Sequence, residues 1–600
     1  MRAILLLLLT SFSILSQGQT IYVNQTATGS NDGSSWTNAY TTLQAALAAL
    51  PSSSANQIWI AKGTYKPHAT NRAASFTISS ADAKLYGGFA GNETQLSERI
   101  VGANETILSG DLLGNDDSNI TYVNSSRDDN SYTVLSVLGD NVELDGLTIA
   151  GGNSNGASGS ATEARYGGGI YKNPATRNLT ITNCKLIRNF SKEAGGAISA
   201  GFSATGSTGT FTMNNCVFSE NLSAIGGVLY TANTGTLALT FSVSNSIFSK
   251  NKAIDTNAAA TGYAGSSMWL RSYGSTASII SNFTNCTFVD NVDSGSASGM
   301  TNSNRATLAL TKNTNSNHIS NISNCVFWGN KAASGTIARP IGGFIESMIS
   351  SATIKNSIDE TNFTGITLSG TSANTSNSNP LFTNLSSSDY TLTSSSPAVD
   401  TGNNANVIGT TDLFGNQRII NTTVDMGAYE FQGCVAPYNI NVNLITDTTA
   451  NVTWSIGGTS ALNVDLVYVL SGQPISSGAP ITGISVNNYS LTGLTPNTNY
   501  DVYLMSNCPS SSNSGWSLAF TFKTLWLGPI YVNHLATGLN DGSSWANAFT
   551  TLDEALLNMT PMGQIRVAQG IYKPSTSGLA DSKKATFLIP TNAKIYGGFN

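Results

Sequence analysis

A short motif that recurs along the chain is the strongest constraint on its fold. Each copy begins with Asn followed by Cys or Ser; five of the six continue through a variable residue to Phe or Leu and end with a second Asn, and the copy at Asn356 is degenerate. The leading asparagines are separated by 32, 30, 40, 39 and 32 residues, and they are Asn183, Asn215, Asn245, Asn285, Asn324 and Asn356. Repeats of this length are typical of a solenoid, in which each repeat forms one coil and stacks on its neighbours.

The alternation inside each copy predicts a strand with one buried face. Coils that stack in parallel place equivalent residues about 4.8 Å apart, so the motif predicts a ladder of Cys184, Cys216, Cys286 and Cys325, and a ladder of Phe218, Phe248, Phe288 and Phe327. Asparagine suits the bends, because it tolerates left-handed backbone and its amide can bond the equivalent Asn one coil away. The variable residue, such as Thr287, is expected to face solvent. The sequence therefore predicts an all-β fold, a right-handed parallel β-helix over residues 19–433.

Two half-motifs alternate over residues 140–360 and carry a resemblance to a known family. One half is F-x-x-N, as in Phe218 to Asn221 and Phe288 to Asn291, and the other is G-G followed by apolar residues, as in Gly195 to Ile198. Together they resemble the polymorphic outer membrane protein repeat, which implies a cell-surface or secreted β-helix of the adhesin type. Residues 396–430 are similar to the closing segment of many bacterial β-helix proteins, and their charged residues are expected to make ion pairs and turns; these are Asp400, Asp412, Arg418 and Asp425.

The start of the chain is duplicated near its end. Residues 21–50 and 530–559 align without a gap and are identical at 20 of 30 positions. Thr41 to Gln44 is typical of a capping box that opens a short helix, which we expect to cap the first coil, since open strand edges must be covered. Residues 525–600 are accordingly expected to be the truncated start of a second β-helix.

Residues 434–524 lack the repeated motif and have a different pattern of apolar residues. Trp454 lies in an alternating stretch, and the spacing of Leu494 and Tyr500 resembles the tyrosine corner of fibronectin type III domains. In that topology Cys434 and Cys508 lie at the same pole, so a disulfide between them is expected in an exported chain. We interpret this domain as a spacer, with a binding module as the alternative.

The first residues and the charge balance indicate where the chain acts. Residues 1–18 contain Arg2, then an apolar run, and then small residues before a cleavage point. This is the pattern of a secretory signal peptide. The expected location is extracellular or on the outer-membrane surface. A net charge of −6 and a pI near 5.2 offer no basic footprint for nucleic acid, and no other segment is apolar enough to span a membrane.

No catalytic constellation is evident in the sequence. The acid-dense stretch around Arg127 holds weak calcium candidates, namely Asp116, Asp117, Asp128 and Asp129, whose Asn-Asp-Asp steps are also typical of turns. The four coil cysteines lack the pairing of a zinc site. We therefore expect no catalytic residues and no cofactor other than structural calcium. The leading hypothesis is a structural adhesin that binds glycans or cell-surface proteins without catalysis; the alternative is a polysaccharide lyase or glycoside hydrolase of the pectate-lyase-like type.

Overall fold

The computed structural model describes most of the chain, which divides into two compact units. The boundary along the chain lies between Phe431 and Gln432. The described residues are 20–51, 56–117, 120–121, 124–157, 160–205, 208–254, 265–294, 306–332, 337–342, 347–363, 372–420, 422–433, 436–456, 462–508, 513–525, 528–559, 563–576, 583, 585–590 and 593–600.

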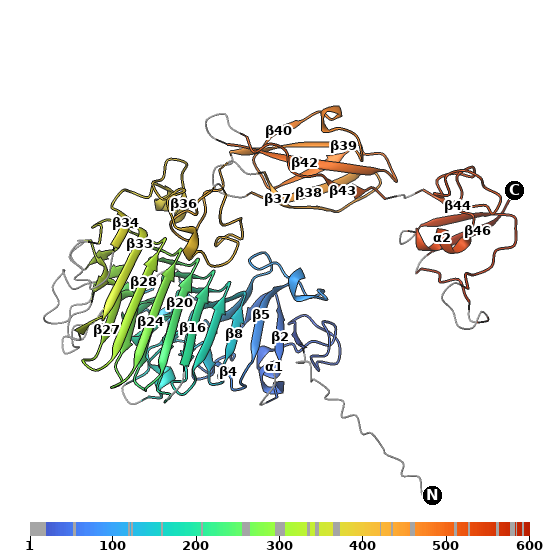
Figure 1. Ribbon diagram of the computed structural model, residues 1–600. Coiled ribbons are helices and arrows are strands. Elements are labelled where there is room, and N and C mark those ends of the chain that lie inside the picture. The colour runs from blue at the N-terminus through green and yellow to red at the C-terminus, as the bar shows by residue number, and fades with distance from the viewer. Residues whose placement is uncertain are drawn as a thin grey trace, which may run out of the picture. The chain divides into compact units, whose positions relative to one another are not determined.

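The first unit is dominated by a long parallel sheet, whose strands stack side by side from blue to yellow in Figure 1. One row of the sheet contains β1 (Thr20–Val23), β2 (Gln57–Ala61), β5 (Lys84–Phe89), β8 (Val142–Asp145), β12 (Asn178–Thr182), β16 (Thr208–Asn214), β20 (Ala238–Ser244), β24 (Ser278–Thr284), β28 (Asn317–Ser323), β33 (Ser351–Asp359) and β34 (Ser372–Ser376). The adjoining row contains β3 (Gly63–Tyr65), β6 (Thr106–Ser109), β9 (Leu147–Ala150), β13 (Lys185–Ile187), β17 (Val217–Ser219), β21 (Ile247–Ser249), β25 (Thr287–Val289) and β29 (Val326–Trp328).

Two further sheets complete the circuits of the chain, and the second of them packs against the same hydrophobic core as the long sheet. One contains β10 (Asn153–Ser154), β14 (Phe190–Ala194), β18 (Leu222–Ile225), β22 (Lys252–Ala253), β26 (Val292–Asp293) and β30 (Lys331–Ala332). The other, called here the third sheet, contains β4 (Phe76–Ile78), β7 (Leu135–Val137), β11 (Ile170–Lys172), β15 (Ile198–Ala200), β19 (Leu229–Asn233), β23 (Gly265–Ser272), β27 (Ala306–Lys312), β31 (Arg339–Gly342) and the antiparallel β32 (Ser347–Met348).

A circuit of the chain adds two strands to the long sheet, one to each row, and one strand to each of the other two sheets. Strands β12, β13, β14 and β15 pair in parallel with β16, β17, β18 and β19 of the next circuit. The predicted all-β fold with parallel strands is therefore confirmed, and the arrangement is consistent with a solenoid.

The phenylalanines of the repeat form a stack inside this unit. The rings of Phe218, Phe248, Phe288 and Phe327 follow one another with centroids 4.7 Å apart and nearly parallel planes. All four side chains are buried. Stacked aromatic pairs add stabilisation beyond the burial of apolar area, so this stack ties each coil to the next.

The asparagines form two different ladders. The leading ones have left-handed φ between 45° and 54°, but their amides form no continuous chain: Asn215 donates to Asn183 at 3.3 Å, whereas Asn245 and Asn285 donate to carbonyls of residues 396–430. The continuous ladder is made by the trailing asparagines, whose amides bond one another at 2.9–3.2 Å, from Asn189 through Asn221, Asn251 and Asn291 to Asn330. Our expectation that an Asn amide bonds the equivalent Asn one coil away is therefore confirmed at the trailing positions. At the leading positions it holds for Asn215 with Asn183 and for Asn324 with Asn285, and elsewhere the closing segment takes up the amides.

The closing segment (residues 396–430) covers the outer side of β21, β25 and β29. Val326 packs with Ala398 and Met426, and Ala428 packs near Val289. Thr287 is only 1% exposed, and its Oγ1 accepts a hydrogen bond of 2.9 Å from the Ala428 amide. The prediction that Thr287 faces solvent is therefore wrong, because the alternation identifies the outward face but not what packs on it.

A short helix closes the first coil. Helix α1 (Leu43–Ala49) buries Leu43 and Ala46 against the core. Its N-cap is Thr42, whose side chain accepts from the Ala45 amide. The predicted box of Thr41 with Gln44 is not formed, because the Gln44 amide donates to the carbonyls of Lys66 and Pro67.

The second unit contains antiparallel and parallel sheets. One antiparallel sheet contains β37 (Tyr438–Asn443), β38 (Thr449–Ser455) and β41 (Asn488–Thr492). The other contains β40 (Ile481–Ile484), β39 (Asn463–Leu470), β42 (Asn499–Asn507) and β43 (Phe520–Lys523). Trp454 and Tyr500 belong to one buried cluster, and the Tyr500 hydroxyl accepts from the Thr495 amide at 2.9 Å. The parallel sheet contains β44 (Ile530–Val532), β45 (Gln564–Ala568) and β46 (Lys594–Phe599), beside α2 (Leu552–Leu557).

The remaining described elements are short. They are β35 (Phe382–Asn384), β36 (Asp389–Leu392) and the 3₁₀ turns η1 (Leu96–Glu98), η2 (Ser125–Arg127), η3 (Thr162–Ala164), η5 (Leu385–Ser387), η6 (Asn404–Asn406) and η7 (Ile475–Ser477).

Candidate functional site

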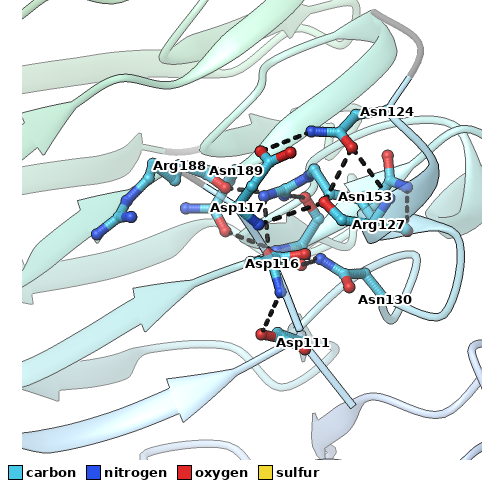
Figure 2. Close-up of polar contacts among 12 residues, drawn as sticks. Asp111, Asp116, Asp117, Asn124, Arg127, Asn130, Asn153, Arg188 and Asn189 are labelled. Atoms are coloured by element: carbon cyan, nitrogen blue, oxygen red, sulfur yellow. Dashed lines mark hydrogen bonds and ion pairs between the residues drawn. The ribbon is translucent and has the colours of Figure 1, made fainter. Parts of the chain in front are cut away.

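The acid-dense stretch follows β6 and forms turns beside the coils (Figure 2). Asp111 organises the first turn: its Oδ1 accepts from the amides of Gly114 (2.6 Å) and Asn115 (3.2 Å), and its Oδ2 accepts from the amide of Asp116 (3.2 Å). A carboxylate that accepts several backbone amides in this way stabilises a turn, so Asp111 has a structural role.

A buried ion pair lies at the centre of this stretch. Arg127 Nη1 and Asp116 Oδ2 are 2.9 Å apart, and the two side chains are 2% and 16% exposed. Burial raises the pKa of Asp116 and lowers that of Arg127, and the opposite charge of each partner opposes the shift. Asn130 also donates to Asp116, at 3.0 Å.

Arg127 also fastens the turns to the neighbouring coils. Its Nη2 donates to the carbonyls of Gly152 (3.0 Å) and Arg188 (2.9 Å), and the Asn153 amide donates to the Arg127 carbonyl at 2.7 Å. Removing one partner of such a buried pair leaves an uncompensated charge. The pair therefore holds the loop in place.

The other calcium candidates have separate surroundings. Asp117 Oδ1 accepts from Asn124 Nδ2 at 2.9 Å, Asp129 Oδ2 accepts from the Leu113 amide at 2.9 Å, and Asp128 is exposed at the end of η2. Across the described ranges, no group of three or more His, Cys, Asp or Glu residues is arranged to hold a metal ion. Calcium at these aspartates stays a prediction.

The coil cysteines lie in the core. Cys184, Cys216, Cys286 and Cys325 are buried and have free thiols. The sulfur atoms of Cys216 and Cys325 lie 3.2 Å from the carbonyl oxygens of Asn214 and Ser323, and burial raises the pKa of Cys216 to about 12. A buried thiol with a raised pKa is a poor nucleophile and a poor metal ligand.

We expect thiol labelling of the folded chain to modify none of the six cysteines. The coil thiols are protected by burial, and Cys508, itself buried, is predicted to be bonded to Cys434, which lies outside the described residues. Unfolding without reductant should then expose the four coil thiols only, as peptide mapping can show. A Thr240→Cys variant, exposed on β20, provides the positive control. Native labelling of Cys434 contradicts the predicted disulfide.

A second buried charge cluster fixes the closing segment. Arg418 is 1% exposed and donates to the carbonyls of Ala428 (3.1 Å) and Gly427, and its Nε lies 3.9 Å from Glu430 Oε2. Asp425 Oδ1 accepts from the Asp400 amide at 2.7 Å, and Asp412 Oδ2 accepts from the Glu430 amide at 3.1 Å. Burial raises the pKa of Asp425 to about 6 and that of Glu430 to about 8.

A row of alternating charges was missed by the sequence reasoning. Arg188, Glu220, Lys250 and Asp290 each directly precede a trailing asparagine, and each has left-handed φ between 51° and 57°. Arg188 and Glu220 approach to 3.7 Å, and burial raises the pKa of Asp290. A hollow of about 250 Å³ is lined in part by Glu220, Lys250 and Asp290. The F-x-x-N motif contains these positions, so reading its third residue across copies would have found the row.

Two ionisable side chains lie in the interior. Lys172 Nζ donates to the Thr176 carbonyl at 2.6 Å, and burial lowers its pKa to about 7. His318 Nε2 lies 3.1 Å from Ser281 Oγ, and burial lowers the pKa of His318 to about 4. Ser281 and His318 are both fully buried, so this pair cannot meet a substrate.

The comparisons with known proteins identify no family. No protein-family model matches the chain, and no curated protein matches it. Similar solved structures include one described as a myokine structure (18% identity, TM-score 0.15, 16% of this chain and 100% of that one). Others are a redesigned β-sandwich protein (29%, 0.14, 15% and 95%) and the fn3 domain of human contactin 1 (17%, 0.15, 16% and 79%). At these TM-scores, no argument rests on them.

Proposed function

We propose that the chain is an exported, surface-displayed or secreted repeat protein of the adhesin type, which binds glycans or cell-surface proteins without catalysis. In this proposal residues 19–433 form a right-handed parallel β-helix of polymorphic outer membrane protein repeats. Residues 434–524 are a fibronectin type III spacer, and residues 525–600 begin a second β-helix. No helix in the described part of the chain is long and apolar enough to cross a membrane.

One observation carries the proposal: the outward face of the long sheet repeats uncharged polar groups from coil to coil. Thr180, Thr212, Ser242, Asn282 and Asn321 occupy equivalent positions on successive strands, and all five are at least partly exposed. The Asn321 amide donates to Asn282 Oδ1 at 2.9 Å. Hydroxyl and amide groups at regular spacing can pair with the hydroxyls of an extended glycan. Binding of the full chain, without residues 1–18, to immobilised polysaccharides and to cells tests the proposal.

A polysaccharide-cleaving enzyme is the second candidate, and the alternating charge row favours it. Glu220 and Asp290 are separated by one coil, so their Cα atoms lie about 9.6 Å apart, twice the interstrand spacing. Side chains that lean slightly toward each other would bring the two carboxyl groups into the range of about 6.5–9.5 Å that inverting glycosidases use, in which one carboxyl has a raised pKa. The burial of Asp290 raises its pKa in the required direction, but Lys250 lies between the two acids in the row.

We expect no turnover of pectin, alginate, xylan or cellulose by the full chain, with or without calcium. Lys250 comes between the two acids in the row, whereas inverting glycosidases leave the space between their carboxyl groups open for a water. Assays of reducing ends and of unsaturated products measure turnover. Activity that is lost in Asp290→Asn and Glu220→Gln, but retained in the exposed control Asp32→Asn, would establish the enzyme instead.

A further inference from the structure

We propose that a groove on the outward face of the third sheet binds an uncharged oligosaccharide. This inference rests on the proposed glycan-binding function and assigns it a site. The groove is a hollow of about 520 Å³ over β4 and β7, within the range of about 300–1,000 Å³ that is usual for small-molecule sites.

The floor of the groove is made of hydroxyl groups. Ser75 Oγ lies 3.0 Å from Ser136 Oγ and 3.3 Å from Thr77 Oγ1, and Thr77 is exposed. Each hydroxyl can donate one hydrogen bond and accept two, so the three together keep capacity for a ligand. Their spacing on adjacent strands matches a ligand that itself presents neighbouring hydroxyls.

One wall of the groove is an aromatic ring held in place from behind. The Arg72 guanidinium lies 4.4 Å from the centroid of the Tyr132 ring. Arg72 Nε donates to the Asn130 carbonyl at 2.7 Å, and its Nη2 donates to Asn155 Oδ1 at 2.8 Å. The guanidinium is therefore engaged by the protein, and Tyr132 is positioned as a rigid surface with an apolar body and a polar tip.

The charge of the groove selects against acidic ligands. The lining of the groove also includes Glu163, on the turn η3, and the described residues that line the groove include no Lys or Arg. The Thr133 hydroxyl donates to the Glu163 carbonyl at 2.6 Å and fixes this turn. The nearest cation, Arg72, already donates to Asn130 and Asn155, and the lining itself offers an acidic ligand a carboxylate and no cation, so the ligand class is a neutral sugar.

The groove is long enough for several sugar units. A second hollow, of about 440 Å³, shares Ser75 and Thr77 with the first and extends along β4 to Gln44 and Leu47 of α1. On the other side of Ser136, Tyr171 occupies the next outward position in register. An elongated groove with aromatic and hydroxyl groups along its length favours an oligosaccharide over a single sugar.

The test uses the full chain and defined sugars: the tetrasaccharides of cellulose, starch, xylan, mannan and chitin as neutral probes, and tetragalacturonate as the acidic probe. We expect calorimetry to detect at least one neutral probe and not tetragalacturonate. Thr77→Trp should weaken that binding by about tenfold or more, since it fills the groove. Thr492→Trp, which places the same ring at an exposed position of β41 in the second unit, should leave it unchanged.

A second variant protects the test against misfolding. Tyr132→Ala should weaken binding, whereas Tyr132→Phe, which retains the ring, should preserve most of it. Three results would each overturn the proposed groove site. They are binding of none of the neutral probes, binding of tetragalacturonate alone, and equal binding by the two Trp variants. If the two Trp variants bind glycans equally well, the groove site is wrong but the proposed glycan-binding function still stands. If the full chain attaches neither to glycans nor to cells, the groove site and the proposed function are both wrong.

Discussion

Replacing Phe288 with Ala is expected to lower the free energy of unfolding of the first unit by about 3–5 kcal/mol, as truncation of a buried aromatic usually does. The Phe288 side chain is fully buried. Its ring lies between those of Phe248 and Phe327, 4.7 Å from each. The substitution removes both stacked pairs and leaves a cavity that the parallel strands cannot close without losing their backbone pairing. Guanidinium unfolding of residues 20–431 measures the loss.

A matched control is available in the same coil. Ile280 on β24 is 42% exposed, so Ile280→Ala should cost less than about 1 kcal/mol. The comparison separates the inward stack from the outward face of neighbouring strands. Similar losses for the two variants would show that the assignment of inward and outward faces is incorrect.

The parallel pairing could be predicted because its signal is local and repeated. In the repeated motif a Phe or Leu follows the Cys or Ser by two residues, which indicates that both side chains point inward. The Asn beside them indicates where the chain turns into the next part of the coil. Residues such as Leu186 and Phe218 become paired neighbours in the long sheet simply because they hold the same place in successive copies. Repetition therefore converts a weak single-strand pattern into a long-range contact.

The closing segment could not be placed from the sequence for the opposite reason. Its contacts join residues more than 100 positions apart, such as Ala428 with Thr287, and no repeat relates them. Thr287 is polar and lies at an outward position of the alternating pattern, as a solvent-facing residue would. It is buried only because a distant segment packs on it. The same holds for Asn245 and Asn285, whose amides are used by that segment and not by one another.

The candidate site shows a related limit of the sequence reasoning. The run of aspartates drew attention to Asp116 and Asp117, but the structure uses Asp116 to neutralise the buried Arg127. The groove over β4 and β7 carries no sequence motif, because Ser75, Tyr132 and Ser136 come together only when separate circuits of the chain stack. A site built from ordinary Ser, Thr and Tyr residues has no signature before the fold is known.

The second large effect is expected at Arg418. Arg418→Met should destabilise the closing segment by about 3–5 kcal/mol, because it removes the cation from a buried group of carboxyls. Part of the loss, from the unpaired carbonyls of Gly427 and Ala428, should not depend on pH. The rest should grow with pH, because burial raises the pKa of Glu430 to about 8 and that of Asp425 to about 6.

The sign of this dependence follows from proton linkage. A carboxyl whose pKa is raised in the folded state contributes stability that is fully present below its unfolded pKa and is lost as the pH rises through its folded pKa. Arg418 holds these pKa values down, so without it the decline should be steeper and should extend to higher pH. Denaturation at pH 5 and pH 9, with hydrogen exchange of residues 396–430, measures both parts.

The surface pair of Arg188 and Glu220 supplies the control for Arg418. Both side chains are more than 40% exposed, and their charged atoms are 3.7 Å apart, so Arg188→Met should cost less than about 1 kcal/mol at either pH. Glu430→Gln should in turn recover part of the stability of Arg418→Met at pH 9 and little at pH 5, because it removes a charge that exists only at the higher pH. A loss in Arg418→Met that is the same at both pH values would mean that the carboxyls do not change their charge between pH 5 and pH 9. If Glu430→Gln then recovered no stability at either pH, Arg418 would hold the closing segment through its carbonyl contacts alone.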